Sequence, residues 1–375
     1  MRGFLNRHRR KFIFGGIFIG SVIFLTRYTH RKLREWQEKE IKEMLEKTKR
    51  RQHFECTERT CNQMILSIAL TLRESIIKIL DITTIVNNLR SGNTPKVVSW
   101  NELKVLAIAR SAVIVYSYAM LATLIRIQLN LVAGLVNKDG QNSGSSSTDK
   151  VAYTYMSLSD YFINEGITKL SLLIKDKVAE ITASISLKDE LTLRDLEQIY
   201  WAITSSISAD NSKDPIKNLA EFMIRPHSEG DDEILSKMST VTLDLLESEE
   251  VQNTTQSNIR KGFILLVDHI AEYFTGPPKA NGTTNMNGIS VPGTSHQTTM
   301  NWLDKTKPDT NYRFDDTFVD ITKVSMPMAK IIPIVCGQVP DKSTAKDVPT
   351  DLLQQLILNS ELQTLGANVF EAFSF

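Results

Sequence analysis

The chain has 375 residues, enough for one large hydrophobic core or for two domains. Its formal net charge of +1 gives no overall positive field, so the composition does not predict binding to nucleic acid. The hydrophobic content of 42% and the charged content of 23% are ordinary for a globular protein. The three cysteines, Cys56, Cys61 and Cys336, form no disulfide framework, which favours a reducing compartment.

An uncharged apolar run, residues 12–26, stands between clusters of basic residues. A cleaved secretory signal should end in an A-x-A-like site, and none follows Thr26. A mitochondrial presequence should be amphipathic, whereas this run is apolar on all sides. We therefore predict an uncleaved transmembrane anchor at 12–28, preceded by a basic flank at 1–11. Basic residues on both sides leave the orientation undecided by charge, and the cysteine pattern favours the cytosol for the bulk of the chain.

Residues 29–55 predict a charged helix that leaves the membrane as a stalk. Glutamate and lysine or arginine side chains repeat at i,i+4 in the orientation that stabilises a helix, beginning with Glu35 and Lys39. A thin apolar stripe that includes Trp36 accompanies them and either packs weakly or stays in solvent. The remainder, 56–375, is expected to form a helical bundle.

The most apolar stretch of the chain, Ser99–Gly134, predicts one long helix that organises the bundle. Ser99 and Glu102 match a capping box, and Val98 and Leu103 stand where a hydrophobic staple would lie. Gly134 is a suitable end point for the helix. A helix that is apolar on nearly all faces must be buried, either in a protein core or in lipid.

Two arginines decide between core and lipid for this helix. Arg110 and Arg126 bracket an apolar run of only about 15 residues, against the ~20 that a membrane span usually needs. Gln128 and Asn130 follow at once, and both would be costly in hydrocarbon. We therefore predict the central helix of a soluble bundle. The alternative is a multi-span translocation component that uses 111–125 as a second span.

Further amphipathic patterns predict an all-α fold, because no convincing strand alternation is present. Loops are expected at 137–150 and 276–312, which are rich in Gly, Ser, Asn or Pro. Pro327 and Pro333 should prevent one uninterrupted helix in the apolar segment near 328–335. The remaining helices are predicted at 57–90, 151–186, 189–208, 232–248, 256–275 and 349–374, with a turn at 90–95.

The sequence carries no common catalytic or nucleotide-binding signature. It has no P-loop, no dinucleotide-binding glycine motif, no H-E-x-x-H and no G-x-S-x-G. Cys56 and Cys61 with nearby His53 could suggest a metal site, but the spacing is poor for zinc and no second pair exists. We predict no catalytic residue, no cofactor, no metal and no small-molecule substrate.

Trp100 is the residue most informative about function. It lies in the first turn of the central helix, with Leu103 nearly one turn further on. It is either a core tryptophan or an anchor in an exposed groove that accepts a partner's amphipathic helix, and Leu89 could contribute to the same floor. A cationic rim for an acidic partner would come from Arg90, Lys96 and Lys104.

Ordered runs across nearly the full chain resemble one protein family, peroxisomal biogenesis factor 3, also called peroxin-3. They are QHFE at 52–55, RTCN at 59–62, SWNELK and VYS in the central helix, IQLNLVAG at 127–134, SLKDELTLRDLEQ at 186–198, AKIIPIVCGQ at 329–338 and ANVFEAFS at 367–374. The segment 276–325 departs from the family in looking longer than the resemblance leads us to expect.

The resemblance implies a single-pass anchor in the peroxisomal membrane, contact with its lipids, and a bundle in the cytosol. It also implies a docking receptor for peroxin-19, the soluble carrier of newly made peroxisomal membrane proteins. In that family an amphipathic helix of the carrier lies in a hydrophobic groove at one end of the bundle, and a tryptophan in a W-x-x-L segment is central. These roles fall here on Trp100 and Leu103, with Leu89 and Lys96 as flanking candidates. A lipid-binding tether remains a further alternative.

Overall fold

The structure is a computed structural model, and it describes residues 2–92, 95–139, 145–225, 233–274, 324–342 and 347–374. Side chains are described for Phe24 and from Thr26 onward within these ranges, except at 137–149. The predicted loop at 276–312 therefore lies outside the described residues. The predicted anchor at 12–28 lies almost wholly where only the backbone is described, so it stays a prediction.

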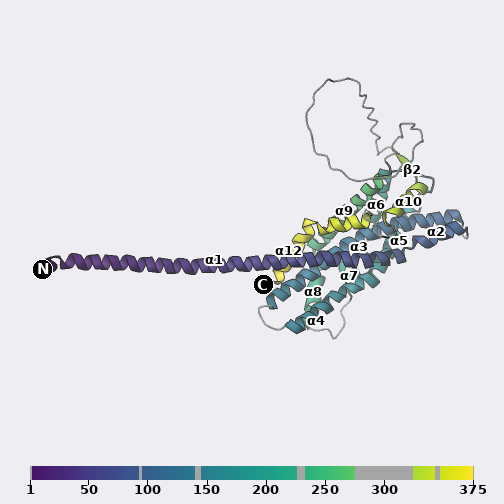
Figure 1. The fold of residues 1–375 in the computed structure, drawn as a ribbon. Helices are drawn as coiled ribbons and strands as arrows, with labels where there is room; N and C mark the ends of the chain where they lie inside the picture. Colours follow the sequence, from purple (N-terminus) through teal and green to yellow (C-terminus); the bar gives the residue numbers. More distant parts are fainter. Residues whose placement is uncertain are drawn as a thin grey trace, which may run out of the picture.

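The described chain is all-α apart from one short β-ladder, which confirms the predicted fold class (Figure 1). The N-terminal half contains α1 Arg2–Ile79, α2 Ile82–Ser91, α3 Lys96–Asp139, α4 Ser145–Met156, a 3-10 turn Ser157–Ser159, a π-helical turn Phe162–Gly166 and α5 Ile167–Thr182. The rest contains β1 Glu190–Thr192, α6 Leu193–Ala209, α7 Leu219–Met223, α8 Glu233–Glu247, α9 Glu249–Ala271, β2 Ser325–Pro327, α10 Met328–Gln338, α11 Val348–Ile357 and α12 Ser360–Phe373.

Helix α1 is one continuous rod that projects from the bundle and then packs along it (Figure 1). The sequence contains no glycine or proline between residues 21 and 91, so nothing breaks the helix where we predicted two separate ones. The break comes instead at Asp81, whose side chain accepts a hydrogen bond from the Thr84 amide and begins α2. Every side chain from Thr26 to Lys49 is exposed, as expected for a solvated stalk.

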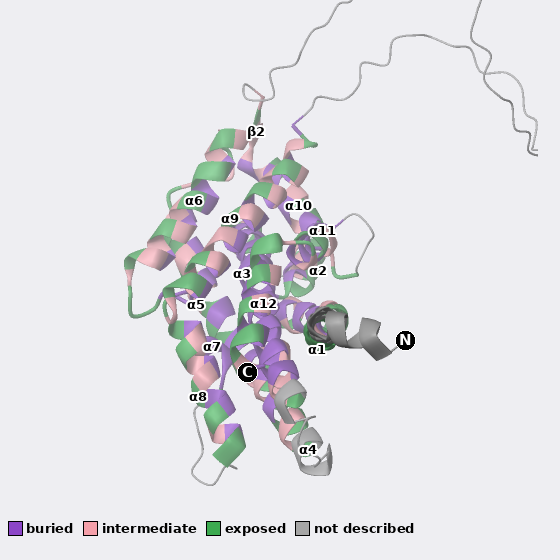
Figure 2. Cartoon of the chain, turned by 90° about the vertical axis from the view of Figure 1, so that its left-hand side faces the viewer, coloured by how far each residue is buried: buried purple, intermediate pink, exposed green. Residues whose placement is uncertain are grey.

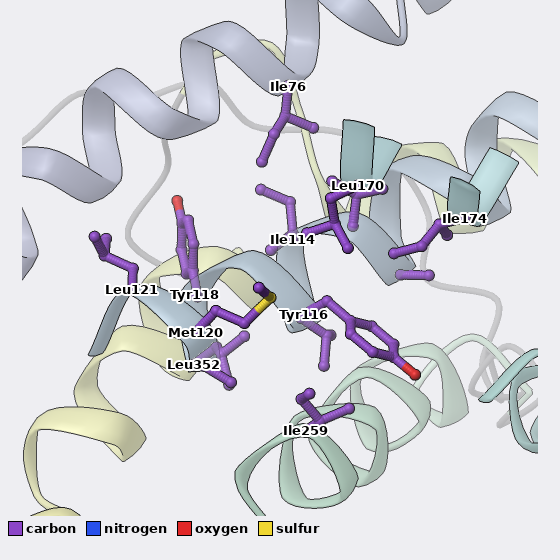
Figure 3. Packing of buried hydrophobic residues seen from close by; sticks show 14 of the residues in the cluster. Ile76, Ile114, Tyr116, Tyr118, Met120, Leu121, Leu170, Ile174, Ile259 and Leu352 are labelled. Atoms are coloured by element: carbon purple, nitrogen blue, oxygen red, sulfur yellow. The ribbon is translucent and has the colours of Figure 1, made fainter. Parts of the chain in front are cut away.

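Helix α3 is the centre of the bundle, flanked by α1, α5, α9, α10 and α12. Every side chain from 106 to 128 is buried, on all faces of the helix (Figures 2 and 3). Each fully buried Leu, Ile or Val contributes roughly 1.5–3 kcal/mol relative to exposure, so this one helix supplies much of the core. Although the run between Arg110 and Arg126 is short, the whole helix is long and apolar enough by composition to cross a membrane. Burial decides between core and lipid instead, because 94% of its most apolar window is buried inside the protein. The helix is therefore a core helix, as predicted, and 111–125 faces protein side chains.

The ends of α3 differ from the prediction. The helix begins at Lys96, where the Pro95 carbonyl accepts hydrogen bonds from the Val98 and Ser99 amides. Proline suits a helix start because its φ is already helical. Ser99 therefore lies inside the helix, and the predicted capping box with Glu102 is wrong.

At its other end α3 continues to Asp139, so Gly134 does not end the helix. Gly134 instead allows close packing: a Cβ built there would lie 3.0 Å from the Phe373 Cβ in α12. The predicted loop at 137–150 is correspondingly shorter, because α3 and α4 cover both of its flanks.

Two further differences concern the C-terminal third. Helix α10 runs through Pro333 without interruption, although we predicted a break. Proline removes one amide donor from the helix, but burial of Ile331, Ile332 and Val335 on the core side compensates for that loss. Strands β1 and β2 pair antiparallel over three residues each, too short for alternation to be visible in the sequence.

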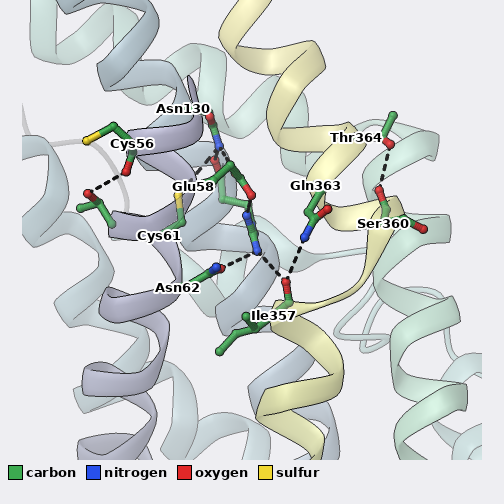
Figure 4. A network of polar contacts seen from close by, with 11 residues as sticks. Cys56, Glu58, Cys61, Asn62, Asn130, Ile357, Ser360, Gln363 and Thr364 are labelled. Atoms are coloured by element: carbon green, nitrogen blue, oxygen red, sulfur yellow. Dashed lines mark hydrogen bonds and ion pairs between the residues drawn. The ribbon is translucent and has the colours of Figure 1, made fainter. Parts of the chain in front are cut away.

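A buried polar network fastens α1 to the centre of the bundle (Figure 4). The fully buried Arg126 guanidinium of α3 forms an ion pair with Glu58 of α1 and donates to the Asn62 side chain at 2.7 Å. The same guanidinium donates to the Ile357 carbonyl at the end of α11 at 3.2 Å, and Gln363 of α12 donates to that carbonyl too. One arginine thus joins three helices.

Arg110, the other arginine of the predicted pair, is also satisfied inside the protein. Its guanidinium donates to the Leu80 carbonyl, which closes the α1–α2 junction, and forms an ion pair with Asp341 at 2.8 Å. A buried charge is tolerated only when it is paired and hydrogen-bonded in this way. The two arginines that argued against a membrane span therefore serve as internal clamps.

Removing Glu58 should strongly destabilise the fold, because the Arg126 charge would remain buried without its carboxylate. We expect Glu58→Ala to lower the free energy of unfolding by about 3–5 kcal/mol. The matched control is Glu55→Ala on the same helix, whose exposed ion pair with Arg51 should contribute less than about 0.5 kcal/mol. Urea denaturation of the full chain in detergent, followed by circular dichroism, measures both. Equal losses for the two variants would contradict this account of the network.

Candidate functional site

The predicted site residues lie where α2 turns into α3, at the end of the bundle farthest from the N-terminus of α1 (Figure 1). Helix α2 begins at the Asp81 cap and ends at Gly92, whose φ of 72° is a left-handed helix cap that favours glycine. Ile82 and Ile85 are buried and hold α2 against α3. The predicted turn at 90–95 begins later than expected, because Arg90 and Ser91 still belong to α2 and the helix ends at Gly92; residues 93–94 lie outside the described residues.

One face of α3 passes from solvent into the core within two turns. Lys96, Trp100 and Leu103 follow one another at i, i+4 and i+7, so they share that face. Lys96 is exposed, Trp100 is half-buried against the core, and Leu103 is buried with 4% exposure. The indole of Trp100 therefore lies at the boundary, with part of its surface in the core and part reaching solvent.

The other predicted residues divide into two groups. Leu89 is half-buried against the core and Arg90 is exposed, both at the end of α2 beside the turn. Lys104, by contrast, is buried, and its ammonium donates to the Thr182 and Ile185 carbonyls at 2.8 and 2.7 Å. Those carbonyls belong to the last residue of α5 and to the turn after it, where a cation stabilises the free acceptors. The prediction that Lys104 is an exposed cation at the rim of the groove is therefore wrong, because its side chain lies inside the protein.

Two exposed apolar side chains at this end were missed by the sequence reasoning. Val97 and Val98 are 66% and 61% exposed, in the first turn of α3. Val98 was assigned to a hydrophobic staple with Leu103, and its exposure shows that no such staple forms. Part of the signal was available in Pro95, because a helix that begins after this proline has both valines in its first turn. We use the name α2–α3 tip for the set Leu89, Arg90, Lys96, Val97, Val98 and Trp100.

The arrangement at the α2–α3 tip suits binding rather than catalysis. It combines a half-buried aromatic ring, exposed aliphatic groups and two exposed cations, and the set that defines the tip contains no His, Asp, Glu, Cys or Tyr. Within the described ranges, no three His, Cys, Asp or Glu side chains gather closely enough to hold a metal ion. Such a surface can accept an apolar helix face with acidic groups beside it.

Comparison with known protein families shows which family the chain belongs to. The Peroxin-3 family model matches residues 3–99, 93–134 and 136–372. The chain belongs to the peroxin-3 family. Peroxisomal biogenesis factor 3 of Rattus norvegicus is 32% identical over 394 residues, covering 100% of this chain and 97% of the relative.

The human and plant relatives agree with this assignment. Peroxisomal biogenesis factor 3 of Homo sapiens is 32% identical and covers 99% of this chain and 96% of its own length. Peroxisome biogenesis protein 3-2 of Arabidopsis thaliana is 23% identical over 72% of this chain and 82% of its own. Membership in the peroxin-3 family supports a role in peroxisome biogenesis, and the family is one of biogenesis factors rather than of known enzymes.

Lys104 should contribute to the stability of the fold, whereas Lys96 should not. Lys104→Ala removes two hydrogen bonds to buried or half-buried carbonyls at the end of α5, so we expect the free energy of unfolding to fall by about 1–3 kcal/mol. Lys96→Ala, the control on the same helix, changes an exposed side chain and should alter it by less than about 0.5 kcal/mol. Thermal melts of the two variants measure the difference. A destabilised Lys96→Ala would show that the tip itself holds the fold.

The three cysteines should differ sharply in reactivity. Burial raises the pKa of the Cys61 thiol to about 12 and that of Cys336 to about 11, whereas Cys56 is exposed. A raised pKa leaves less of the reactive thiolate at neutral pH. We expect maleimide to label Cys56 in the native protein at pH 7 and the other two at least about a hundredfold more slowly. Mass spectrometry after timed quenching measures this, and Cys56→Ser should abolish the fast phase.

Proposed function

We propose that this member of the peroxin-3 family is the docking receptor of the peroxisomal membrane for peroxin-19, the carrier of newly made peroxisomal membrane proteins. The observation that supports this most directly is the half-buried Trp100 at one end of the bundle, beside the exposed Val97 and Val98. It is a non-catalytic function, which a surface of apolar and cationic side chains suits.

The chemistry of the α2–α3 tip fits an amphipathic helix with acidic flanks. The apolar face of such a helix would cover Trp100 and the two valines, removing exposed hydrocarbon from water. Arg90 and Lys96 would face the acidic side chains, which raises the association rate and fixes the orientation. Aromatic anchors of this kind commonly provide most of the binding energy of a small interface.

The length of α1 supports a receptor held away from the bilayer. If residues 12–28 cross the membrane, about 51 helical residues separate the anchor from the end of α1, a distance of roughly 75 Å. The α2–α3 tip lies beyond that point, so a soluble carrier could dock without touching lipid. In this arrangement the bundle faces the cytosol, where a soluble carrier would meet it.

Trp100→Ala should weaken binding of the carrier's amphipathic helix without unfolding the receptor. We expect a loss of about 2–4 kcal/mol, which corresponds to roughly 30- to 1,000-fold in the dissociation constant. Trp36→Ala is the control, because Trp36 is a well exposed tryptophan on the stalk, far from the tip. Isothermal titration of the full chain in nanodiscs with a peroxin-19 helix peptide gives the two constants.

The same variants separate binding from folding. The melting temperature of Trp100→Ala should stay within a few degrees of the parent, because the indole is only half-buried. A melt that shows an unfolded variant would identify Trp100 as a core residue and contradict the proposal. Arg90→Glu with Lys96→Glu should weaken binding chiefly through a slower association rate.

A further inference from the structure

A second apolar groove lies on the side of the bundle, between α6 and α9. Its volume is about 580 Å³. Its floor is formed by Tyr200 of α6 and Phe263 of α9, whose ring centroids are 5.5 Å apart. Both floor residues are buried, so the two helices are packed firmly against each other there. None of the residues of the α2–α3 tip lines this groove.

Large apolar side chains stand uncovered on the walls of the groove. Trp201 of α6 is 74% exposed and Ile264 of α9 is 60% exposed, and Leu193 and Val267 extend the same apolar lining. Scattered exposed apolar residues are ordinary, but here they face one hollow from two adjacent helices. No helix of the described chain covers these two side chains, as their exposure shows.

Charged side chains border this apolar lining. Glu197 lies one turn before Trp201 on α6, and Asp268 lies one turn after Ile264 on α9. Arg260 lies one turn before Ile264, about 12 Å along the helix from Asp268. Among the residues that the structure describes, none of these three forms a salt bridge. The groove therefore offers two carboxylates and one guanidinium to an incoming partner.

We propose that the α6–α9 groove is a second docking site, and that it takes an amphipathic helix of a partner protein whose apolar stripe is flanked mainly by basic residues. Two helices packed side by side present ridges on which a third helix can lie. The stripe would cover Trp201 and Ile264, the basic side chains would face Glu197 and Asp268, and one acidic side chain would face Arg260. This charge preference is opposite to that of the cationic α2–α3 tip, so the two sites select different helices.

The test uses the full chain in phosphatidylcholine nanodiscs and three fluorescent 18-residue helical peptides. The first carries leucines at i, i+3 and i+4 spacing flanked by lysines and one glutamate. The second has glutamates in place of those lysines, and the third has the first peptide's composition with the stripe scrambled. We expect the first peptide to bind, the scrambled peptide not to bind, and Trp201→Ala to weaken binding at least about tenfold.

Matched variants separate this groove from other surfaces. Tyr273→Ala, an exposed aromatic residue just past α9 that does not line the groove, should change the dissociation constant less than about twofold. Trp100→Ala should also leave it unchanged, which distinguishes this proposal from docking at the tip. The double variant Glu197→Lys with Asp268→Lys should reverse the preference, so that the glutamate peptide binds more tightly than the lysine peptide.

Four outcomes would overturn the proposal. Equal binding of the scrambled peptide would indicate non-specific adhesion, and an unaffected Trp201→Ala variant would place the peptide elsewhere. Loss of binding in Trp100→Ala would assign the peptide to the tip. Self-association of the chain in analytical ultracentrifugation that disappears in Trp201→Ala would make a second copy the occupant. Circular dichroism melts verify that each variant is folded before its binding is interpreted.

Discussion

The enclosure of α3 by its neighbours is the constraint on which the rest of this structure depends. A helix apolar on every face has no stable place in water, and here α1, α5, α9, α10 and α12 surround it. Because each neighbour contributes one apolar stripe and keeps a polar side in solvent, the bundle needs only one fully apolar helix. The positions of the surrounding helices are therefore determined largely by the surface of α3.

Buried arginines fix the positions of the neighbouring helices along α3. Hydrophobic contacts alone are non-directional, whereas a guanidinium must find several acceptors at fixed positions. Arg126 finds them on α1 and at the end of α11, and Arg110 finds them at Leu80 and Asp341. Arg73 of α1 does the same with Asp347, the cap of α11, at 2.9 Å. These clamps fix how far α1 slides along α3, and hence where the stalk leaves the bundle.

The sequence predicts the fold class and the central helix well, because hydrophobic periodicity over long segments is a strong signal. It fails at helix ends and breaks, where a single local interaction decides. Pro95 begins α3 one turn before the expected Ser99 cap, and Pro333 is carried inside α10 because core burial outweighs one lost amide donor. Neither the start of α3 nor the tolerance of Pro333 inside α10 can be predicted without knowing which side chains are buried.

At the candidate site, too, the sequence pattern predicts some features, and others depend on how the helices pack. The spacing of Trp100 and Leu103 predicts that they share one face of the helix, and the structure agrees with that geometry; the role of Trp100 in binding stays a prediction. The sequence could not show that Lys104 is buried while Lys96 is exposed, because both are simply lysines near the start of the helix. Only the position of the carboxyl end of α5 shows which lysine points inward. The exposure of Val97 and Val98 was likewise not predicted, because the helix was expected to start at Ser99 instead of Lys96.

The enclosure of α3 also explains why a docking surface on α3 itself would lie at one of its ends. Along its sides every apolar group of α3 between 106 and 128 is already in contact with a neighbour, so nothing remains for a partner. Its large exposed apolar groups occur only near its ends, at Val97 and Val98 and at Val136, within the part whose side chains are described. The first end carries Trp100 and is the one farther from the N-terminus of α1 (Figure 1). A helical partner that made apolar contact with the core helix would therefore find it at the α2–α3 tip, and the predicted anchor would keep that end away from the membrane.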